Sequence, residues 1–550
     1  MELALSLLTL LYADLRFNYE EILDAFFKRL IRVLLLILGF LMYPFVHLRA
    51  FKKQKKCPPI NNEILLLSAT ELARRIRRKE LSSEQVVMSY IKRCKEVNVI
   101  INAIVDERFD DAIVDARKVD KFLLTTIKSE IELNNEMPLL GVPVTVKESI
   151  AVKGMSHSSG LKIKNPIISD FDSDVILRVK KAGGIPLLVS NTPEMCMCWE
   201  TYNNVTGTTW NPYNTNKTAG GSSGGEAALL ASAASVVSIS SDIGGSARLP
   251  ALFCGVFGHK PTPEYISTHG HMPTCDDSSW SSFFSIGPMV RYSEDLTMML
   301  KVLCQSDKFD ASHLDQKVEL SDIKFYYMES DKSPSTNTVD IEIINGIQRF
   351  IKHMESARGI KVQKADIKEM KYAFETSSSM LLQLNGVDTI YKKGSNPREW
   401  KSVFLEVIKY ISFMSPHTFP NIAYGVLKKF VDTLPDGYNK WINDKNNLIK
   451  KRFQDLLGEN GVLIYPGFTT AAHYPYEIYS KVADVSYMMI FNSIGLPVTQ
   501  CPLGLNKDGL PIGFQVVGNV GKDHLTIAVA REIERAFGGW QEPPSDLKTV

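Results

Sequence analysis

Two clusters of glycine and serine constrain this chain more than any other part of its sequence. The first is Gly220-Gly-Ser-Ser-Gly-Gly-Glu226, and the second is Ser241-Asp-Ile-Gly-Gly-Ser-Ala-Arg248. Six glycines in so short a stretch indicate tight backbone turns with accessible N–H groups. Turns of this kind can bind either a phosphate or an oxyanion.

The phosphate interpretation requires a spacing that neither cluster has. A P-loop needs G-x-x-x-x-G-K-[ST], and a dinucleotide site needs G-x-G-x-x-G between a strand and a helix. The second cluster instead places consecutive backbone amides directly before Ser246. That arrangement stabilises the anion that forms when a serine attacks a carbonyl, so the sequence favours acyl transfer by a serine nucleophile.

A serine nucleophile needs a base, and the sequence offers two candidates. His259 lies in GVFGHKPT, where neither an Asp pattern nor a G-x-S-x-G elbow completes a Ser-His-Asp triad, so we interpret it as a structural or surface residue. Lys147 ends the apolar segment GVPVTVK. Burial lowers the pKa of a lysine and lets its amine accept a proton near pH 7, so Lys147 fits Ser–Lys catalysis better.

The order of these motifs resembles the amidase signature family of serine hydrolases. Ser222 follows Lys147 by 75 residues and Ser246 follows Ser222 by 24 (222 − 147 and 246 − 222), and the resemblance runs from about residue 66 to 540. The segment NTPEMCMCWETYNN and an apolar N-terminus are most similar to the type-2 branch of the fatty-acid amide hydrolases. The resemblance implies one large α/β domain with a mixed central β-sheet flanked by helices.

The resemblance also implies the roles of individual residues. Ser246 is expected to be the nucleophile, Ser222 the bridging serine and Lys147 the general base. The oxyanion hole is expected to consist of backbone N–H groups, those of Ile243, Gly244, Gly245 and Ser246. We expect no cofactor and no metal. Asp242, Arg248 and Ser223 are either supports of the loop or ordinary polar turn residues.

The substrate side is less explicit in the sequence. Cys196, Met197 and Cys198 lie in a segment that lines the acyl pocket in relatives, and soft apolar side chains suit a lipid chain, although core packing is an alternative. Two cysteines without further ligands nearby make a poor metal site. The apolar segment 402–427 is either a substrate gate, as in relatives, or a helix buried in the core or in a homodimer.

The N-terminal region differs from the rest of the chain. Val33 to Val46 carries no charge, and with its neighbours it forms an apolar segment at about 30–48, only marginally long enough to cross a membrane. Five cations follow it, namely Arg49, Lys52, Lys53, Lys55 and Lys56. The positive-inside rule then places the remainder of the chain in the cytosol. We therefore expect a single-pass or monotopic anchor at 1–56, with a buried helix of the catalytic domain as the alternative.

The remainder, 57–550, reads as one catalytic domain with a helical insertion at about 308–460. Capping boxes at Ser68–Glu71 and Ser82–Gln85 predict the starts of two helices. Near the end, two apolar segments around the turn at 507–509 predict a strand pair followed by a helix.

Composition narrows the classes of partner. Lys and Arg number 63 against 61 Asp and Glu, so no overall charge favours nucleic acid. Eight widely spaced cysteines are too few for a disulfide scaffold and suit a reducing compartment. The expected partners are a lipid amide substrate and a membrane, and a homodimer is possible. Three alternative functions stay open: an amidase of short or aryl amides, the A-type subunit of a transfer-RNA amidotransferase, and a non-enzymatic lipid-binding membrane scaffold.

Overall fold

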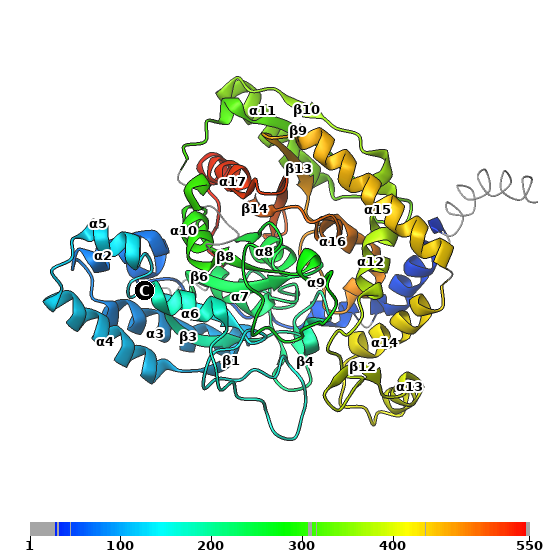
Figure 1. Ribbon diagram of the computed structural model, residues 1–550, viewed down its shortest axis with the longest axis horizontal. Coiled ribbons are helices and arrows are strands. Elements are labelled where there is room, and N and C mark those ends of the chain that lie inside the picture. The colour runs from blue at the N-terminus through cyan, green and yellow to red at the C-terminus, as the bar shows by residue number, and fades with distance from the viewer. Residues whose placement is uncertain are drawn as a thin grey trace, which may run out of the picture.

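The chain is arranged around a large β-sheet, as the computed structural model shows (Figure 1). The structure describes residues 28–29, 32–44, 46–305, 311–314, 316–434 and 436–545. Eleven of the described strands form one sheet in the order β1-β3-β2-β6-β8-β7-β14-β15-β13-β9-β10. Their bounds are β1 Ile104–Glu107, β2 Pro143–Lys147, β3 Ile185–Ser190, β6 Val237–Asp242, β7 Phe257–Lys260, β8 Ser285–Val290, β9 Lys324–Tyr327, β10 Val362–Lys364, β13 Gly461–Pro466, β14 Val498–Leu505 and β15 Pro511–Gly518.

The sheet is mixed, which confirms the predicted α/β class. β2 runs parallel to β3 and β6, whereas the strands from β6 through β8, β7, β14 and β15 to β13 pair antiparallel. Val146 of β2 lies opposite Ile239 of β6. Because parallel strands end at the same edge of a sheet, Lys147 and Ser241 are brought to one edge. Two small hairpins lie outside the sheet, formed by β4 Tyr202–Asn203 with β5 Gly207–Thr208 and by β11 Lys392–Lys393 with β12 Asn396–Trp400.

Helices surround this sheet, with α2 to α5 at one end of the molecule and α12 to α15 at the other (Figure 1). Their bounds are α2 Ala69–Arg77, α3 Ser83–Ile101, α4 Phe109–Thr125, α5 Glu130–Glu136, α6 Asp174–Lys181, α7 Gly224–Ala231, α8 Arg248–Cys254, α9 Trp280–Phe283, α10 Glu294–Leu303, α11 Ile341–Arg358, α12 Ala373–Gln383, α13 Val403–Ile411, α14 Phe419–Asp432, α15 Asp436–Leu457, α16 Ser486–Ser493 and α17 Asp523–Phe537. Short 3-10 turns include η3 Glu194–Cys196 and η7 Glu477–Val485.

Two of these helices cover opposite faces of the sheet. A Cβ placed on Gly258 of β7 would come within 2.9 Å of the Ala251 Cβ in α8. The side chain of the next residue, His259, reaches Asp523 of α17 instead, at 3.1 Å. Successive residues of a strand point to opposite faces, so α8 and α17 lie on the two sides of β7. Glycine at 258 allows α8, which follows the second glycine–serine cluster, to approach the strand closely.

Local signals predicted helix starts well, with one difference. Ser82 and Gln85 form the complete capping box at the start of α3. At α2 only half of the expected box forms: Ser68 caps the Glu71 amide, but the Glu71 carboxylate bonds Arg74 and Arg75. The predicted strand pair and helix near the C-terminus are confirmed as β14, β15 and α17.

The predicted helical insertion at 308–460 requires a correction. Its first part contributes β9 and β10 to the central sheet, where β9 pairs in parallel with β13. Only 373–457, from α12 to α15 with the β11–β12 hairpin, forms a mainly helical layer at the end of the molecule. β10 is polar because it is the edge strand of the sheet, and edge strands tolerate charged side chains.

The N-terminal apolar segment is helical over 32–44 and rests on the catalytic domain. Arg32 Nη1 donates to Asn337 Oδ1 at 2.5 Å, and a Cβ on Gly39 would come within 3.3 Å of the Ser480 Cβ in η7. Leu34, Phe40 and Leu41 on this helix are exposed, so it is not a buried core helix. Residues 1–27, the first part of the predicted anchor, lie outside the described residues. Across the residues that the structure describes, no helix has both the length and the apolar character needed to cross a membrane.

We predict that Gly225→Ala destabilises the fold. A Cβ at this second position of α7 would lie 2.6 Å from the carbonyl oxygen and 2.7 Å from the amide nitrogen of Asn191, both backbone atoms. Overpacking of this kind costs about 1–3 kcal/mol in the free energy of unfolding. Gly437→Ala, at the second position of α15 with nothing within 4 Å, is the matched control. Chemical denaturation of both variants measures the difference, and equal stabilities would contradict the packing argument.

Candidate functional site

The two glycine–serine clusters form adjacent turns that lead into neighbouring helices. α7 begins at Gly224, directly after Ser222 and Ser223, and α8 begins at Arg248, two residues after Ser246. The Ser223 amide donates to the Ser246 carbonyl at 3.1 Å, which joins the two turns. Ser222 is fully buried and Ser246 is 5% exposed. The clusters therefore position two serines at the starts of two helices.

Lys147 lies at the end of β2 and reaches the first of these serines. Its Nζ is 2.6 Å from Ser222 Oγ and 3.0 Å from Ser241 Oγ. The lysine side chain is completely buried. Burial lowers its pKa from the usual 10.5, and the nearby Cys196, Asp242 and Glu226 oppose that shift only in part. Burial therefore disfavours the protonated form of Lys147, and its amine lies within hydrogen-bond distance of Ser222.

A buried ion pair shapes the turn that precedes Ser246. Asp242 accepts hydrogen bonds from the Gly245 amide at 2.8 Å and the Ala247 amide at 3.2 Å. Arg248 donates to both oxygens of the same carboxylate at 3.0 Å, in a bidentate pair. Burial alone would raise the pKa of Asp242, but the Arg248 guanidinium and the Gly245 amide hold that pKa well below its usual range. Asp242 and Arg248 are therefore supports of this turn, one of the two expectations for them.

The ion pair is anchored to the C-terminal part of the chain. Arg248 also donates to the Met488 carbonyl at 3.0 Å and to Asn492 Oδ1 at 2.7 Å, both on α16. A further bond of 3.2 Å reaches Gln515 Oε1 on β15. These hydrogen bonds of Arg248 therefore attach the turn between β6 and α8 to α16 and β15.

Four amides were expected to form an oxyanion hole, and the structure places all four in this turn. The Gly245 N–H already donates to Asp242, whereas Ile243, Gly244 and Ser246 lie on either side of it. Trp199 Nε1 donates to the Gly244 carbonyl at 2.9 Å and holds that peptide from the other side. The carboxylate and the indole together limit how the peptides of this turn can rotate.

Two residues of the site were not expected from the sequence. Ser241, the last serine of β6, accepts from Lys147, and its Oγ lies 3.0 Å from His271 Nε2. His271 is nine-tenths buried and lies in the loop between β7 and β8. Ser241 could have been found from its place beside Asp242 in the second cluster. His271 carries no motif in the sequence THGHMPT, so only the fold reveals it.

The three residues expected to line the acyl pocket occupy different surroundings. The Cys196 thiol is 3.4 Å from Thr192 Oγ1, and burial acts to raise its pKa, but the neighbouring Lys147 and His271 lower it. Met197 is half-buried and packs against two apolar clusters at once, the main core and a smaller one under α13 and α14. Cys198 is buried. Cys196 thus lies at the polar end of the site, and Met197 faces the apolar side.

His259, the alternative base, is not joined to these serines. Its ring bonds Thr499 Oγ1 at 2.9 Å and Asp523 Oδ1 at 3.1 Å, and it is completely buried. These contacts attach α17 to the sheet and agree with the structural role expected for it. Among the described residues, no three His, Cys, Asp or Glu side chains are grouped so that they could hold a metal ion.

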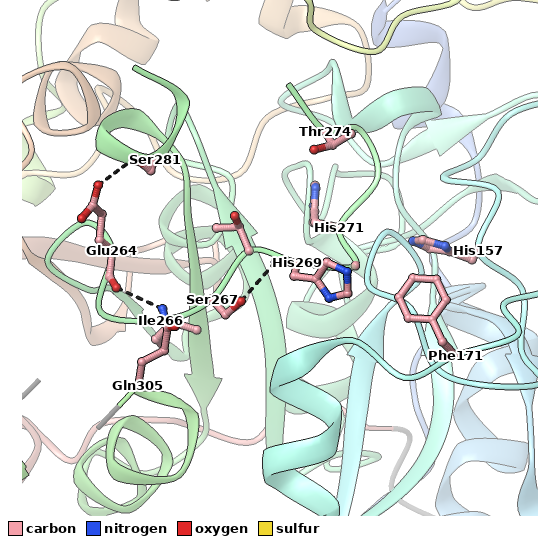
Figure 2. Close-up of a pocket in the computed structure, with 12 residues that line it drawn as sticks. His157, Phe171, Glu264, Ile266, Ser267, His269, His271, Thr274, Ser281 and Gln305 are labelled. Carbon is pink, nitrogen blue, oxygen red and sulfur yellow. Dashed lines mark hydrogen bonds between the residues drawn. The ribbon is translucent and has the colours of Figure 1, made fainter. Parts of the chain in front are cut away.

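His271 also lines a cavity of about 550 Å³ (Figure 2). His157 and Phe171 line it together with His271, and the Glu264–Ser281 hydrogen bond marks the opposite wall. His271 is therefore shared between the wall of this cavity and the hydrogen bonds around Lys147.

Comparisons with known proteins agree with the fold and the motifs. The sequence profile described as Amidase matches residues 85–527. The chain is 39% identical over 524 residues to fatty-acid amide hydrolase 2 of Homo sapiens, covering 94% of this chain and 97% of that protein. It is 38% identical over 502 residues to fatty-acid amide hydrolase 2-B of Danio rerio, covering 90% and 93%. A solved structure of a fatty acid amide hydrolase has the same fold, with a TM-score of 0.67 and 22% identity over 86% of each chain.

The mixed sheet and these matches define an enzyme that hydrolyses carbon–nitrogen bonds. The chain belongs to the amidase family.

We predict that Asp242→Ala strongly destabilises the protein. The change leaves the Arg248 guanidinium buried without its carboxylate and removes an acceptor from two amides, which typically costs about 3–5 kcal/mol. Denaturant unfolding measures the free energy. Asp366→Ala, which removes an exposed partner of Lys332, is the control and should leave the midpoint unchanged. A midpoint for Asp242→Ala equal to that of the control would show that the turn does not depend on this ion pair.

Proposed function

We propose that this amidase is a membrane-associated serine hydrolase that cleaves fatty-acid amides into a free fatty acid and an amine. The observation that carries the chemistry is the 2.6 Å contact between the buried Lys147 amine and Ser222, beside the turn that bears Ser246. The relatives that are named fatty-acid amide hydrolases support the choice of substrate. Such a reaction proceeds through an acyl-enzyme.

In the proposed mechanism Ser246 is the nucleophile, Ser222 the bridge and Lys147 the general base. The neutral Lys147 amine accepts the Ser222 proton while Ser222 accepts the proton of Ser246, whose oxygen attacks the amide carbon. The protonated Lys147 then returns its proton through Ser222 to the leaving nitrogen. An amine leaves poorly until it is protonated, so this return makes amide cleavage possible. Water later attacks the acyl-enzyme by the same proton path.

The anion of the tetrahedral intermediate is assigned to the amides of the turn before Ser246. Ile243, Gly244 and Ser246 supply N–H groups, whereas the Gly245 N–H, also expected in this role, donates to Asp242 and holds the turn. Preorganised donors of this type are each worth about 10²–10³ in rate. Asp242 and Arg248 serve by keeping the turn in place before the substrate arrives.

The apolar side of the site extends from Met197 toward α13 and α14. Met195, Ile390, Tyr391 and Ile422 form a buried cluster against which Met197 and Val403 pack. We assign the acyl chain to this side and Cys196 to the end near the carbonyl. α13 and α14 themselves are not buried core helices, because Phe404, Ile411 and Phe430 are exposed. Their outer faces suit either a substrate gate at a lipid surface or contact with a second copy of the chain.

We assign this surface to a membrane, with the catalytic domain in the cytosol. Phe419 at the start of α14 packs against Tyr479 of η7 at a ring distance of 5.1 Å, and the N-terminal helix rests on the neighbouring Ser480. The exposed apolar faces of the helix at 32–44 and of α14 therefore flank the same element, at the same end of the molecule (Figure 1). Exposed lysines at 52–56 follow and suit anionic lipid headgroups.

We predict that Lys147→Ala suppresses hydrolysis of a long-chain amide more than that of the matched ester. An ester's alkoxide leaves without prior protonation, so it depends less on the proton that Lys147 returns. Steady-state rates on the two substrates give the ratio, and Ser246→Ala should abolish both rates together with labelling by a fluorophosphonate.

Two outcomes would contradict this proposal. Equal losses on amide and ester would remove the proton-returning role of Lys147, and labelling of Ser246→Ala would exclude Ser246 as nucleophile. A short or aryl amide hydrolysed faster than the long-chain amide would favour the alternative substrates.

We predict that Phe404→Asp with Ile411→Asp lowers binding to vesicles of phosphatidylcholine and phosphatidylserine by about tenfold, because two exposed apolar side chains of α13 lose their place in the lipid. Co-flotation of the full chain with the vesicles measures binding. Ile127→Asp, which alters a fully exposed apolar residue between α4 and α5, is the control. A loss of self-association with unchanged flotation would assign the surface to a homodimer instead.

A further inference from the structure

The hydrogen bonds around Lys147 form a chain with a definite direction, which begins at His271. The Nδ1 atom of His271 lies 2.8 Å from the Pro273 carbonyl oxygen. A carbonyl can only accept, so Nδ1 carries the hydrogen, and Nε2 of the neutral imidazole is an acceptor. The fold thus fixes the tautomer of His271 through a neighbouring backbone group.

The second step of the chain is the Ser241 hydroxyl. It lies 3.0 Å from His271 Nε2 and 3.0 Å from Lys147 Nζ. When Ser241 donates its single hydrogen to Nε2, its oxygen can only accept from Lys147. A neutral amine has two hydrogens and one lone pair. With one hydrogen directed at Ser241, the lone pair is available to Ser222, 2.6 Å away.

We propose that His271 is a positioning residue for amide hydrolysis. Its Nε2 accepts a hydrogen bond from the Ser241 hydroxyl, Ser241 accepts one from Lys147, and the Lys147 lone pair is thereby directed at Ser222. This inference rests on the proposed role of Lys147 as general base. No hydrogen bond joins His271 to either serine of the proposed Ser246–Ser222 pair, and its proposed effect on Lys147 passes through Ser241. The same chain stabilises protonated Lys147, because Ser241 is then an obligatory acceptor for the ammonium group.

Other polar and titratable groups lie beside the hydrogen bonds that join His271, Ser241 and Lys147. A test of the proposal must control for their effects. Ser149 Oγ is also 3.0 Å from His271 Nε2 and competes for its lone pair. Cys196 faces both Lys147 and His271, and Asp242 and Glu226 act on Lys147 from β6 and α7. His157 acts on His271 from the wall of the neighbouring cavity, and the Phe284 ring packs on His271 at 4.5 Å.

The test compares His271→Leu with His271→Gln in the full-length protein on a long-chain amide. In the leucine variant the freed Ser241 hydroxyl can donate to the Lys147 lone pair, which diverts that lone pair from Ser222. We expect kcat to fall by about 10–100-fold with KM nearly unchanged. Glutamine offers its amide oxygen to Ser241 and is expected to restore most of kcat.

The direction in which the pH profile of kcat/KM shifts distinguishes a positioning role of His271 from a general loosening of the site. kcat/KM rises with pH as Lys147 loses its proton. In His271→Leu, donation from Ser241 stabilises the neutral amine and lowers its pKa, so the acidic limb moves to lower pH. A loosened site admits water, weakens desolvation and moves the limb to higher pH. An unshifted limb, or one shifted upward, would overturn the proposal.

Three further variants complete the test. Ser241→Ala alone should also move the acidic limb to lower pH, and adding His271→Leu to it should cause no further shift. If His271→Leu does not fold, Ser241→Ala and His271→Gln keep the inference testable, because Ser241→Ala should still shift the limb and His271→Gln should not. His157→Leu removes another largely buried imidazole from the same cavity wall and should leave the limb in place. A glutamine variant as slow as the leucine variant would overturn the proposal.

The proposed function can fail separately from this inference. If a fluorophosphonate does not label Ser246 in the unaltered enzyme, the serine mechanism fails first. If labelling and amide turnover are normal but His271→Leu keeps the original rate and profile, only the role of His271 is lost.

Discussion

The removal of the Lys147 amine from water is the constraint on which the site depends. A lysine in water is protonated at pH 7 and cannot act as a base, and complete burial at the end of β2 weakens this preference by lowering the pKa of Lys147. A buried neutral amine must still have its hydrogens and lone pair satisfied, and Ser222 and Ser241 do so from two separate segments. The parallel pairing of β2 with β6 brings one of those segments within reach.

The turn before Ser246 contains a buried group, Asp242, whose charged form is stabilised rather than disfavoured. Asp242 remains ionised because Arg248 pairs with it and backbone amides bond it. The site therefore contains a buried amine whose protonated form is disfavoured and a buried carboxylate whose ionised form is stabilised. The first suits a group that must change protonation during the reaction, whereas the second suits a fixed support.

Much of this arrangement could be predicted from the sequence, because local patterns carry it. The apolar strand ending at Lys147 and the glycine–serine turns carry the resemblance to the amidase signature family, and that resemblance implied the fold class and the pairing of Lys147 with Ser222. His271 could not be predicted, since its link to Ser241 arises only when the loop between β7 and β8 returns to the edge of β6. The position of β10 was missed because an edge strand lacks the apolar run of a central one. The half-formed box at α2 shows that arginines close in sequence compete successfully for Glu71.

The positions of β9 and β10 in the sheet also show where the layer from α12 to α15 joins the rest of the enzyme. The layer from α12 to α15 is inserted between the end of β10 at Lys364 and the start of β13 at Gly461, two strands that both pair with β9. Both ends of the layer are therefore tied to neighbouring positions of one rigid scaffold. Residues within the layer can therefore differ without a change in the register of the sheet, and that register places Lys147 of β2 beside Ser241 of β6.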